Sequence, residues 1–303
     1  MMAPAKTVGL APLDRRRRLR AALERLRARS GSSRDVSQDP VEFPRRFRDS
    51  RDIEIVGWLA SALAYGRVSL FRAVLERVLA LMGSSPYRFV LGFDPGRDVR
   101  RFARLYYRMN RGEDIACLLY LMRSVIKRHG SIGALFERGY HGKDEDIGPA
   151  LERFVRHVRG IDTTPIYGRR LTPHGLSQFL SLPSKGSACK RLNLFLRWMV
   201  RPDDGVDFGL WKGIPPAKLV IPLDTHIFRI GRYLGFTRRR TPGWKAAADI
   251  TRALRRFDPE DPLRYDFALC HLGISGNCPV RKDTDKCRIC PLLPSCARGR
   301  MLV

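Results

Sequence analysis

Apolar residues recur at intervals of three and four along most of the chain, which is the spacing of one face of an α-helix. The clearest case begins after Asp49 or Ser50, either of which suits a helix cap, and its apolar positions are Ile55, Trp58, Leu59, Ala62 and Leu63. The alternation in steps of two that marks a half-buried strand is nearly absent. The pattern therefore predicts an all-α fold.

Further segments carry the helical pattern, and we expect helices within residues 69–83, 114–130, 147–160, 174–183, 187–201, 223–236, 241–257 and 261–274. Residues 14–30 place Leu19, Ala22 and Leu26 at helical spacing among many arginines. This segment has two interpretations, a basic amphipathic helix or a solvated tail. We expect residues 1–40 to form a basic N-terminal segment and residues 41–303 to form the helical domain.

The charge balance narrows the choice of partners. The 303 residues include 57 Lys and Arg against 30 Asp and Glu, a formal net charge of +27 at pH 7. Such an excess favours nucleic acid, because each neutralised phosphate releases condensed counterions. No apolar stretch is long enough to span a bilayer, and the N-terminus lacks a signal-peptide pattern. We expect a cytoplasmic, nucleoid-associated protein with no membrane partner.

Four of the seven cysteines stand close together near the C-terminus, at Cys278, Cys287, Cys290 and Cys296. Their spacing, Cys-x8-Cys-x2-Cys-x5-Cys, suits either a tetrahedral zinc ion or a [4Fe–4S] cluster. Zinc ribbons are typically built from two Cys-x2-Cys pairs, whereas this loop has one pair with wide, unequal arms. The spacing favours iron–sulfur, with zinc as the alternative. The remaining cysteines fall in helical segments and are expected to be buried.

This cysteine loop resembles the iron–sulfur loop of endonuclease III and the related adenine glycosylases, which belong to the helix–hairpin–helix DNA glycosylases. The first spacer here is two residues longer than the Cys-x6-Cys of that family, and the other two agree. In that family the cluster holds a basic loop against DNA phosphates and does no chemistry on the substrate. The resemblance implies the same role for residues 278–296, with the DNA contacts made by Arg281, Lys282, Lys286 and Arg288.

A second stretch, IPLDTHIFRIGRYLG at residues 221–235, is similar to the segment that carries the catalytic aspartate of these glycosylases. The resemblance assigns that role to Asp224. A fixed carboxylate suits the reaction, because cleavage of an N-glycosidic bond develops positive charge on the sugar. The alternative is that Asp224 only caps the helix that follows it.

The segment SLPSKGSACK at residues 181–190 is similar to the family's hairpin, Leu-Pro-Gly-Val-Gly-x-Lys, although Ser184 replaces the first glycine and Ala188 occupies the lysine register. The resemblance implies phosphate contacts from Lys185, Gly186 and Ser187. We expect Lys190 to be the nucleophile, because the first turn of a helix favours its neutral amine; Lys185 is the reserve candidate. A lysine that opens this helix, with a long gap before the aspartate, also resembles archaeal 8-oxoguanine glycosylases.

Together these features predict a bilobal, all-α helix–hairpin–helix DNA glycosylase with a C-terminal iron–sulfur loop. A monomer is expected to excise a damaged base, with an oxidised purine favoured, from duplex DNA containing a lesion or abasic site, and AP lyase activity would follow through a Schiff base on Lys190. A flipped base needs an aromatic slot, for which Tyr65, Phe208 and Trp211 are candidates. Two alternatives stay open: a non-catalytic iron–sulfur DNA-binding protein, and a zinc protein that binds RNA or another protein.

Overall fold

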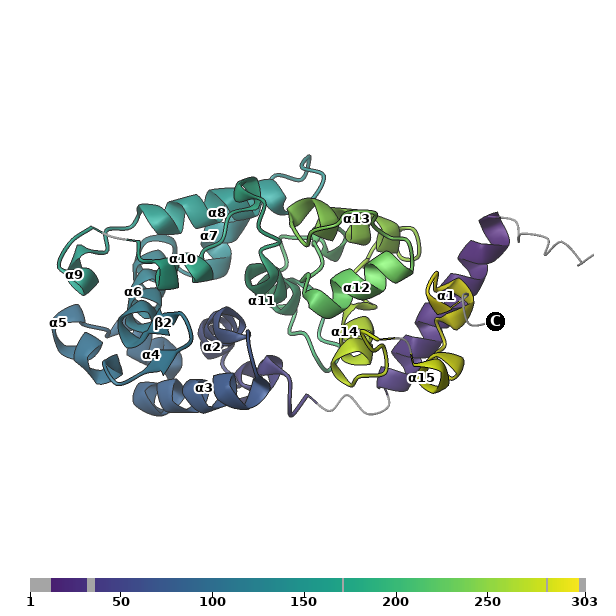
Figure 1. The fold of residues 1–303 in the computed structure, drawn as a ribbon. Coiled ribbons are helices and arrows are strands. Elements are labelled where there is room, and N and C mark those ends of the chain that lie inside the picture. Colours follow the sequence, from purple (N-terminus) through teal and green to yellow (C-terminus); the bar gives the residue numbers. More distant parts are fainter. Residues whose placement is uncertain (1–11, 32–35, 171, 282, 300–303) are drawn as a thin grey trace, which may run out of the picture. The chain divides into compact units, whose positions relative to one another are not determined.

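The computed structural model describes residues 12–31, 36–170, 172–281 and 283–299, and within these ranges the chain is mostly helical (Figure 1). The all-α prediction is confirmed at this level. The one sheet recorded there is a short antiparallel pair, β1 (Tyr106–Tyr107) and β2 (Asn110–Arg111). Among the same residues, no helix is both long and apolar enough to cross a lipid bilayer.

The chain divides into two compact units that are discontinuous in sequence. Unit 1 contains residues 1–33, 224–240 and 264–303, and unit 2 contains residues 34–223 and 241–263. This division differs from the expected one, because the N-terminal segment belongs to the same unit as the C-terminal cysteine loop. Asp224 opens a stretch of unit 1, whereas Lys190 belongs to unit 2.

Unit 2 holds most of the helices. They are α2 (Ser50–Leu63), α3 (Val68–Met82), α4 (Pro86–Leu91), α5 (Pro95–Asp98), α6 (Gly112–His129), α7 (Ile132–Arg138), α8 (Gly148–Gly160), α9 (Thr164–Tyr167), α10 (His174–Phe179), α11 (Lys190–Val200) and α13 (Trp244–Arg255).

Helix α2 is the centre of the unit 2 core. Every residue from Asp52 to Leu63 is buried, which is typical of a helix surrounded by other elements. It packs against α11, where the Trp58 and Phe195 rings stack with centroids 6.0 Å apart. Gly57 permits this close approach, because a Cβ there would lie 3.1 Å from Cε of Met199. Asp49 caps the helix as predicted, accepting a hydrogen bond from the amide of Arg51 at 2.9 Å.

Unit 1 consists of α1 (Pro12–Gly31), α12 (Thr225–Tyr233), α14 (Asp266–Ile274) and α15 (Thr284–Arg288), together with the cysteine loop. Helix α1 settles the choice between helix and tail for residues 14–30. Its apolar residues Leu19, Ala22, Leu23 and Leu26 are buried, and it packs on α14 and on the 3-10 turn Leu293–Ser295 of the cysteine loop. Glu24 adds a polar contact by accepting a 2.6 Å hydrogen bond from the hydroxyl of Tyr265.

Candidate functional site

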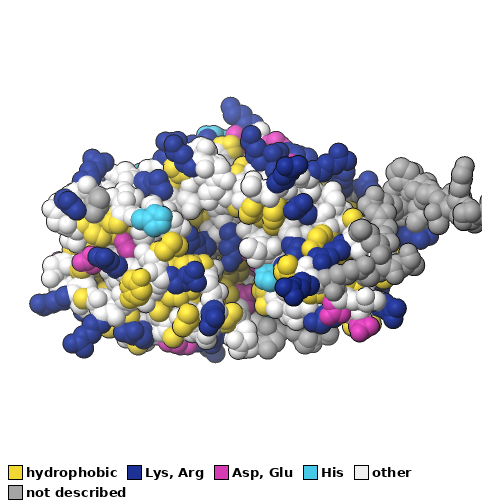
Figure 2. All heavy atoms as spheres, in the orientation of Figure 1, with side chains coloured by type: hydrophobic (Ala, Val, Ile, Leu, Met, Phe, Trp, Pro, Cys, Tyr) yellow, Lys and Arg dark blue, Asp and Glu magenta, His cyan; other side chains and the backbone are white. Residues whose placement is uncertain are grey.

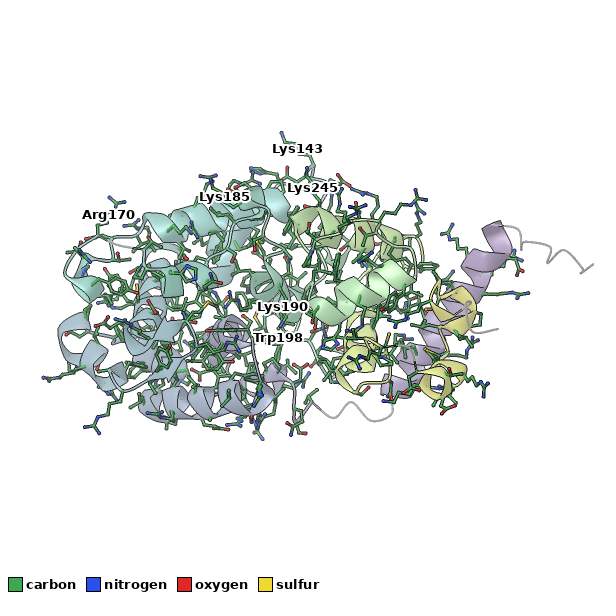
Figure 3. All side chains as sticks on the ribbon, in the orientation of Figure 1. Lys143, Arg170, Lys185, Lys190, Trp198 and Lys245 are labelled. Atoms are coloured by element: carbon green, nitrogen blue, oxygen red, sulfur yellow. The ribbon has the colours of Figure 1, made fainter. Side chains whose placement is uncertain are left out.

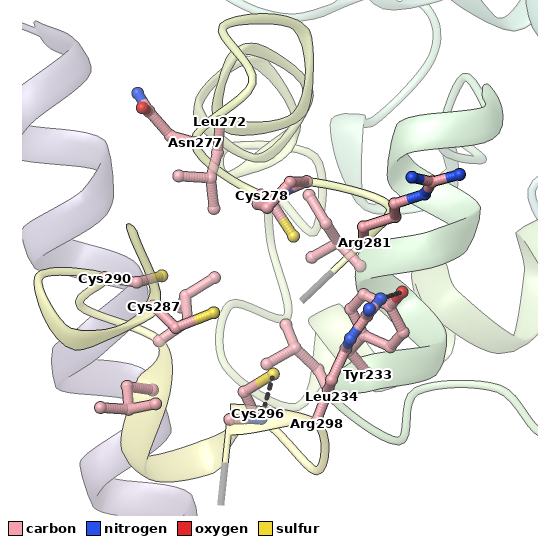
Figure 4. Close-up of a pocket in the computed structure, with 15 residues that line it drawn as sticks. Tyr233, Leu234, Leu272, Asn277, Cys278, Arg281, Cys287, Cys290, Cys296 and Arg298 are labelled. Carbon is pink, nitrogen blue, oxygen red and sulfur yellow. Dashed lines mark hydrogen bonds between the residues drawn. The ribbon is translucent and has the colours of Figure 1, made fainter. Parts of the chain in front are cut away.

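The four clustered cysteines line a single pocket in unit 1 (Figure 4). Their thiols point towards the same space from the two sides of the loop, and the remaining walls are largely apolar. Helix α12 supplies part of the wall through Ile230 and Tyr233, its C-cap residue Leu234 adds to it, and α14 supplies Leu272. Arg281 and Arg298 also line the pocket. The spacing in the sequence thus brings together four sulfur ligands around one cavity.

The cysteines of this pocket lie close enough to influence one another electrostatically. All four cysteines are free. Burial raises the pKa of Cys278 and Cys290, and the other cysteines of the pocket add to this rise because neighbouring thiolates would repel. A bound metal centre would offset the repulsion between neighbouring thiolates, because ligation to a metal deprotonates a thiol outright. The sulfur of Cys296 also accepts a hydrogen bond from the amide of Gly299 at 3.3 Å, a contact that tunes ligated sulfurs.

Four cysteine sulfurs are the donor set that a [4Fe–4S] cluster takes, one for each iron, and the same number suits a tetrahedral zinc ion. Cys278, Cys287, Cys290 and Cys296 would hold either group. Within the described part of the chain, no set of three or more His, Cys, Asp and Glu side chains forms a group that could hold a metal ion as it stands.

Hydrogen bonds fasten the cysteine loop to α12 and α14. The amide of Cys278 donates to the carbonyl of Leu272 at 3.0 Å, and the amide of Ala297 donates to the carbonyl of Tyr233 at 2.8 Å. Arg229 on α12 donates to the carbonyl of Cys278 at 2.6 Å and lies 3.2 Å from Nδ1 of His226. Nothing in the sequence singled out Arg229, yet it connects the helix that follows Asp224 to the first cysteine.

Asp224 is the N-cap of α12. Its Oδ1 accepts a hydrogen bond from the amide of Ile227 at 2.7 Å, which satisfies one of the free donors at the start of the helix. Its Oδ2 accepts a hydrogen bond from the thiol of Cys270 on α14 at 3.4 Å. Asp224 therefore does cap α12, its half-buried carboxylate is held in one orientation, and its catalytic role stays a prediction. Cys270, expected only to pack, takes part in holding it.

Lys190 is the first residue of α11, as expected, and it is half-buried. Its Nζ donates a hydrogen bond to the carbonyl of Ala64 at 2.9 Å, at the C-terminal end of α2. The next residue, Arg191, donates to the carbonyl of Ala62 at 3.2 Å in the same region. Both side chains therefore donate to main-chain carbonyls at the C-terminal end of α2.

The hairpin between α10 and α11 is exposed where phosphate contacts were predicted. Residues Pro183–Lys185 form a 3-10 turn, and Gly186 follows in the left-handed conformation with φ of 79°. Lys185 and Gly186 are exposed, and Ser187 is half-buried with its Oγ accepting a hydrogen bond from the amide of Cys189 at 3.1 Å. Figure 3 shows Lys185 and Lys190 on separate parts of this segment.

The cysteine loop presents cations to solvent. Arg281, Lys286 and Arg288 are exposed, and Lys282 lies outside the described residues. Lys286 donates to the carbonyl of Gly276 at 3.2 Å and has Asp283 4.0 Å away. On the face drawn in Figure 2, Lys and Arg side chains are widespread and Asp and Glu side chains are sparse. Because Arg281, Lys286 and Arg288 are exposed, these cations of the loop are accessible to an anionic partner.

The three aromatic candidates for a base slot have different surroundings. Trp211 is a core residue: 5% of it is exposed, and its Nε1 donates a 2.8 Å hydrogen bond to the buried Glu54. The assignment of Trp211 to a base pocket is thus corrected, because packing against Phe136 and Phe195 occupies the ring. No sequence pattern indicates the Glu54 contact, because it joins residues far apart in the chain.

Tyr65 and Phe208 are both half-buried. The hydroxyl of Tyr65 donates a hydrogen bond to Oδ1 of Asn110 at 2.5 Å, and the guanidinium of Arg191 lies 4.9 Å from the ring centre. Phe208 lies under the guanidinium of Arg45 at 5.1 Å. The Tyr65 ring has two further neighbours, the guanidinium of Arg108 at 5.7 Å and the ring of Tyr107 with its centroid 4.8 Å away, so it is more enclosed than a free stacking surface.

The chain is thus a helical protein with a four-cysteine pocket in one unit and an exposed hairpin in the other. It belongs to the family described as protein of unknown function (DUF2400), whose family model matches residues 39–275. The matched segment contains Lys190 and Asp224 and ends before Cys278. No curated protein and no solved structure matches the chain.

Proposed function

We propose that this protein is a DNA glycosylase of the helix–hairpin–helix class that carries a structural [4Fe–4S] cluster and also cleaves abasic sites. The observation that carries the proposal is the four-cysteine pocket, whose wall includes α12, the helix capped by Asp224. The sequence resemblance links these two features in the glycosylases. The exposed hairpin and the exposed cations of the cysteine loop supply groups suited to DNA phosphates.

In the proposed reaction, Lys190 gives up its hydrogen bond to Ala64 and its neutral amine adds to C1′ of the deoxyribose. The bond between C1′ and the base nitrogen breaks, and the base leaves with the bonding electrons and takes the proton that the amine loses. The C1′–O4′ bond of the sugar ring then breaks, O4′ takes up a proton from solvent, and the nitrogen lone pair forms the protonated Schiff base between Nζ and C1′. Asp224 stabilises the positive charge that develops on the sugar. The cluster, when bound, holds the basic loop in place.

The decisive experiment is borohydride trapping on duplexes that carry an abasic site or 8-oxoguanine. The wild-type chain is expected to form a covalent protein–DNA adduct, because borohydride reduces the Schiff base to a stable amine. Lys190→Gln should abolish the adduct, and Lys185→Gln, an exposed lysine of the same segment, should retain it. An adduct that depends on Lys185 would assign the nucleophile to that residue instead. Duplex binding with neither adduct nor base release would reject the proposal that the protein is an enzyme.

A non-catalytic iron–sulfur DNA-binding protein is the second candidate. The observation in its favour is that both proposed catalytic side chains already have partners, Lys190 on a carbonyl and Asp224 on an amide and a thiol. In the trapping experiment this candidate predicts duplex binding without an adduct.

Metal analysis tests the cofactor separately. Protein purified without oxygen should contain iron and acid-labile sulfide, and Cys278→Ser should lower both, whereas Cys117→Ala, which alters a buried cysteine of unit 2, should not. Zinc without sulfide would support the third candidate, a zinc protein that binds RNA or another protein.

A further inference from the structure

A second pocket, in unit 2, is lined by arginines that no part of the proposed function uses. Arg77 comes from α3, and Arg100, Arg101 and Arg104 come from the 3-10 turn Val99–Phe102 and the loop after it. We call the cavity that these four side chains line the arginine pocket. Leu81, Ala80 and Ala103 contribute apolar surface between them. The pocket is open to solvent and has about 870 Å³ free of protein atoms.

Backbone carbonyls hold two of the arginines in place. Arg101 donates a hydrogen bond to the carbonyl of Leu81 at 2.7 Å, and its guanidinium lies 5.1 Å from the ring centre of Phe89. Arg77 donates to the carbonyl of Arg104 at 3.4 Å. These contacts tie the end of α3 to the loop after the 3-10 turn, so the cations are brought together by the fold itself.

The charges of the arginine pocket are hardly compensated. Asp98 is the one carboxylate recorded near them, 3.3 Å from Arg101, but it is fully buried and also binds Arg97 at 2.8 Å. In the part of the chain that the structure describes, no ion pair is recorded for Arg77, Arg100 or Arg104. Four guanidinium groups gathered around one pocket repel one another, and an external anion relieves that repulsion.

Carboxylates do occur on the neighbouring surface, but they form ion pairs with arginines outside the pocket. Glu76, beside Arg77 in sequence, forms a 2.6 Å ion pair with Arg46 instead. Glu42 also pairs with Arg46, at 2.6 Å, and with Arg72 at 3.0 Å. The carboxylate next to Arg77 in the sequence is thus engaged with another arginine, and the arginine pocket is left with its positive charge.

We propose that the arginine pocket binds the phosphate groups of a phosphorylated ligand. Arginine suits this role, because its planar guanidinium donates two parallel hydrogen bonds to phosphate oxygens. The apolar surface of Leu81, Ala80 and Ala103 provides contact for the sugar or base that accompanies the phosphate. Two sources share this chemistry, the backbone of a nucleic-acid strand and a free nucleotide. The site requires neither Lys190 nor the cysteine loop.

The first test is calorimetric titration of the full chain with pyrophosphate. Arg100→Gln/Arg104→Gln changes two exposed side chains of the pocket, and Arg169→Gln/Arg170→Gln removes the same charge from exposed positions elsewhere in unit 2. We expect pyrophosphate binding to weaken about tenfold or more in the pocket variant, equivalent to about 1.4 kcal/mol, and to stay unchanged in the control. Absence of saturable binding by the wild type, or equal weakening in both variants, would overturn the proposal.

The second arm identifies the source of the phosphate by measuring the affinity of the same variants for a short DNA duplex. A larger loss in the pocket variant than in the control assigns the arginine pocket to a nucleic-acid strand. An equal loss of duplex affinity in both variants, with pyrophosphate binding lost in the pocket variant alone, assigns it to a free nucleotide. Borohydride trapping through Lys190 is read separately, so failure of one proposal does not imply failure of the other.

Discussion

Arg229 donates a 2.6 Å hydrogen bond to the main-chain carbonyl of Cys278, joining α12 to the first cysteine of the pocket. The helix that Asp224 caps and the loop that carries the cysteines are therefore joined directly within unit 1. Further hydrogen bonds, from the amide of Ala297 to the carbonyl of Tyr233 and from the amide of Cys278 to the carbonyl of Leu272, reinforce it. Loosening the loop should therefore loosen the helix as well.

Arg229→Met tests this coupling. Loss of a hydrogen bond from a charged donor is expected to cost about 1.5–3 kcal/mol, and the loop around Cys278 should open more often. Amide hydrogen exchange measures the effect directly, because the amide of Cys278 is hydrogen-bonded to the carbonyl of Leu272 and should exchange faster in the variant. Arg232→Met, at an exposed position of the same helix, should leave that amide protected. Equal protection in Arg229→Met would show that the loop is held by other contacts.

Asp224 offers a way to separate capping from catalysis. Asp224→Asn keeps a side-chain oxygen for the amide of Ile227 but removes the charge, so urea unfolding should change by less than about 0.5 kcal/mol. Asp224→Ala removes the cap and should cost about 1 kcal/mol. If the proposed reaction is correct, both variants lose base release. An Asn variant that excises the base at the wild-type rate would show that Asp224 acts only as a cap.

Helix positions were predictable where apolar residues repeat over several turns. The expected helix in residues 69–83 is α3, and the one in residues 114–130 is α6, because their apolar residues repeat over several turns. The short helices α4, α5, α7 and α9 were not predicted, since one or two turns are too few to show a period. Helix α1 was ambiguous because its partner α14 lies at the other end of the sequence.

The site was predictable only in part, for a related reason. Cysteine spacing is local, so it could indicate that Cys278, Cys287, Cys290 and Cys296 share a cavity. The contacts of other residues depend on distant segments. Lys190 binds the carbonyl of Ala64, and Trp211 binds Glu54, and neither contact leaves a pattern in the sequence. The arginine pocket was also missed, because its charge stands out only after nearby carboxylates are seen to pair elsewhere.

The burial of Trp211 predicts a structural role that can be measured. Glu54 accepts hydrogen bonds from Nε1 of Trp211 at 2.8 Å and from the amides of Gly133 and Ile132 at 2.8 and 3.1 Å. Trp211→Phe keeps an aromatic ring but removes one hydrogen-bond donor from the Glu54 carboxylate. The free energy of unfolding should therefore fall by about 1–3 kcal/mol. Duplex affinity should not change. A double-mutant cycle with Glu54→Gln should show strong coupling. Weakened duplex binding at full stability would restore Trp211 to the base slot.

A pair of histidines in unit 2 predicts a pH dependence of stability. His129 at the end of α6 and His157 on α8 have their Nε2 atoms 3.0 Å apart, and Arg138 lies 3.3 Å from Nδ1 of His129. Burial lowers the pKa of both imidazoles, the charges of His157, Arg138 and Arg128 lower that of His129 further, and Arg128 acts in the same direction on His157. Two adjacent imidazoles among arginines resist taking up protons.

Because the folded pKa values lie below the unfolded value of about 6.5, the unfolded chain binds protons more readily as the pH falls. The stability that the two neutral histidines contribute is fully present above the unfolded pKa. It decreases as the pH falls from the unfolded pKa towards the lower pKa values of the folded state. We expect the Tm of the wild type to fall more steeply between roughly pH 7.5 and 5.5 than that of His129→Gln/His157→Gln, in circular-dichroism melts. His141→Gln, at an exposed position of the same unit, should follow the wild type. Parallel Tm curves for the wild type and the double variant would mean that these histidines do not titrate as a pair, and the acid sensitivity would then have to come from carboxylates elsewhere in the fold.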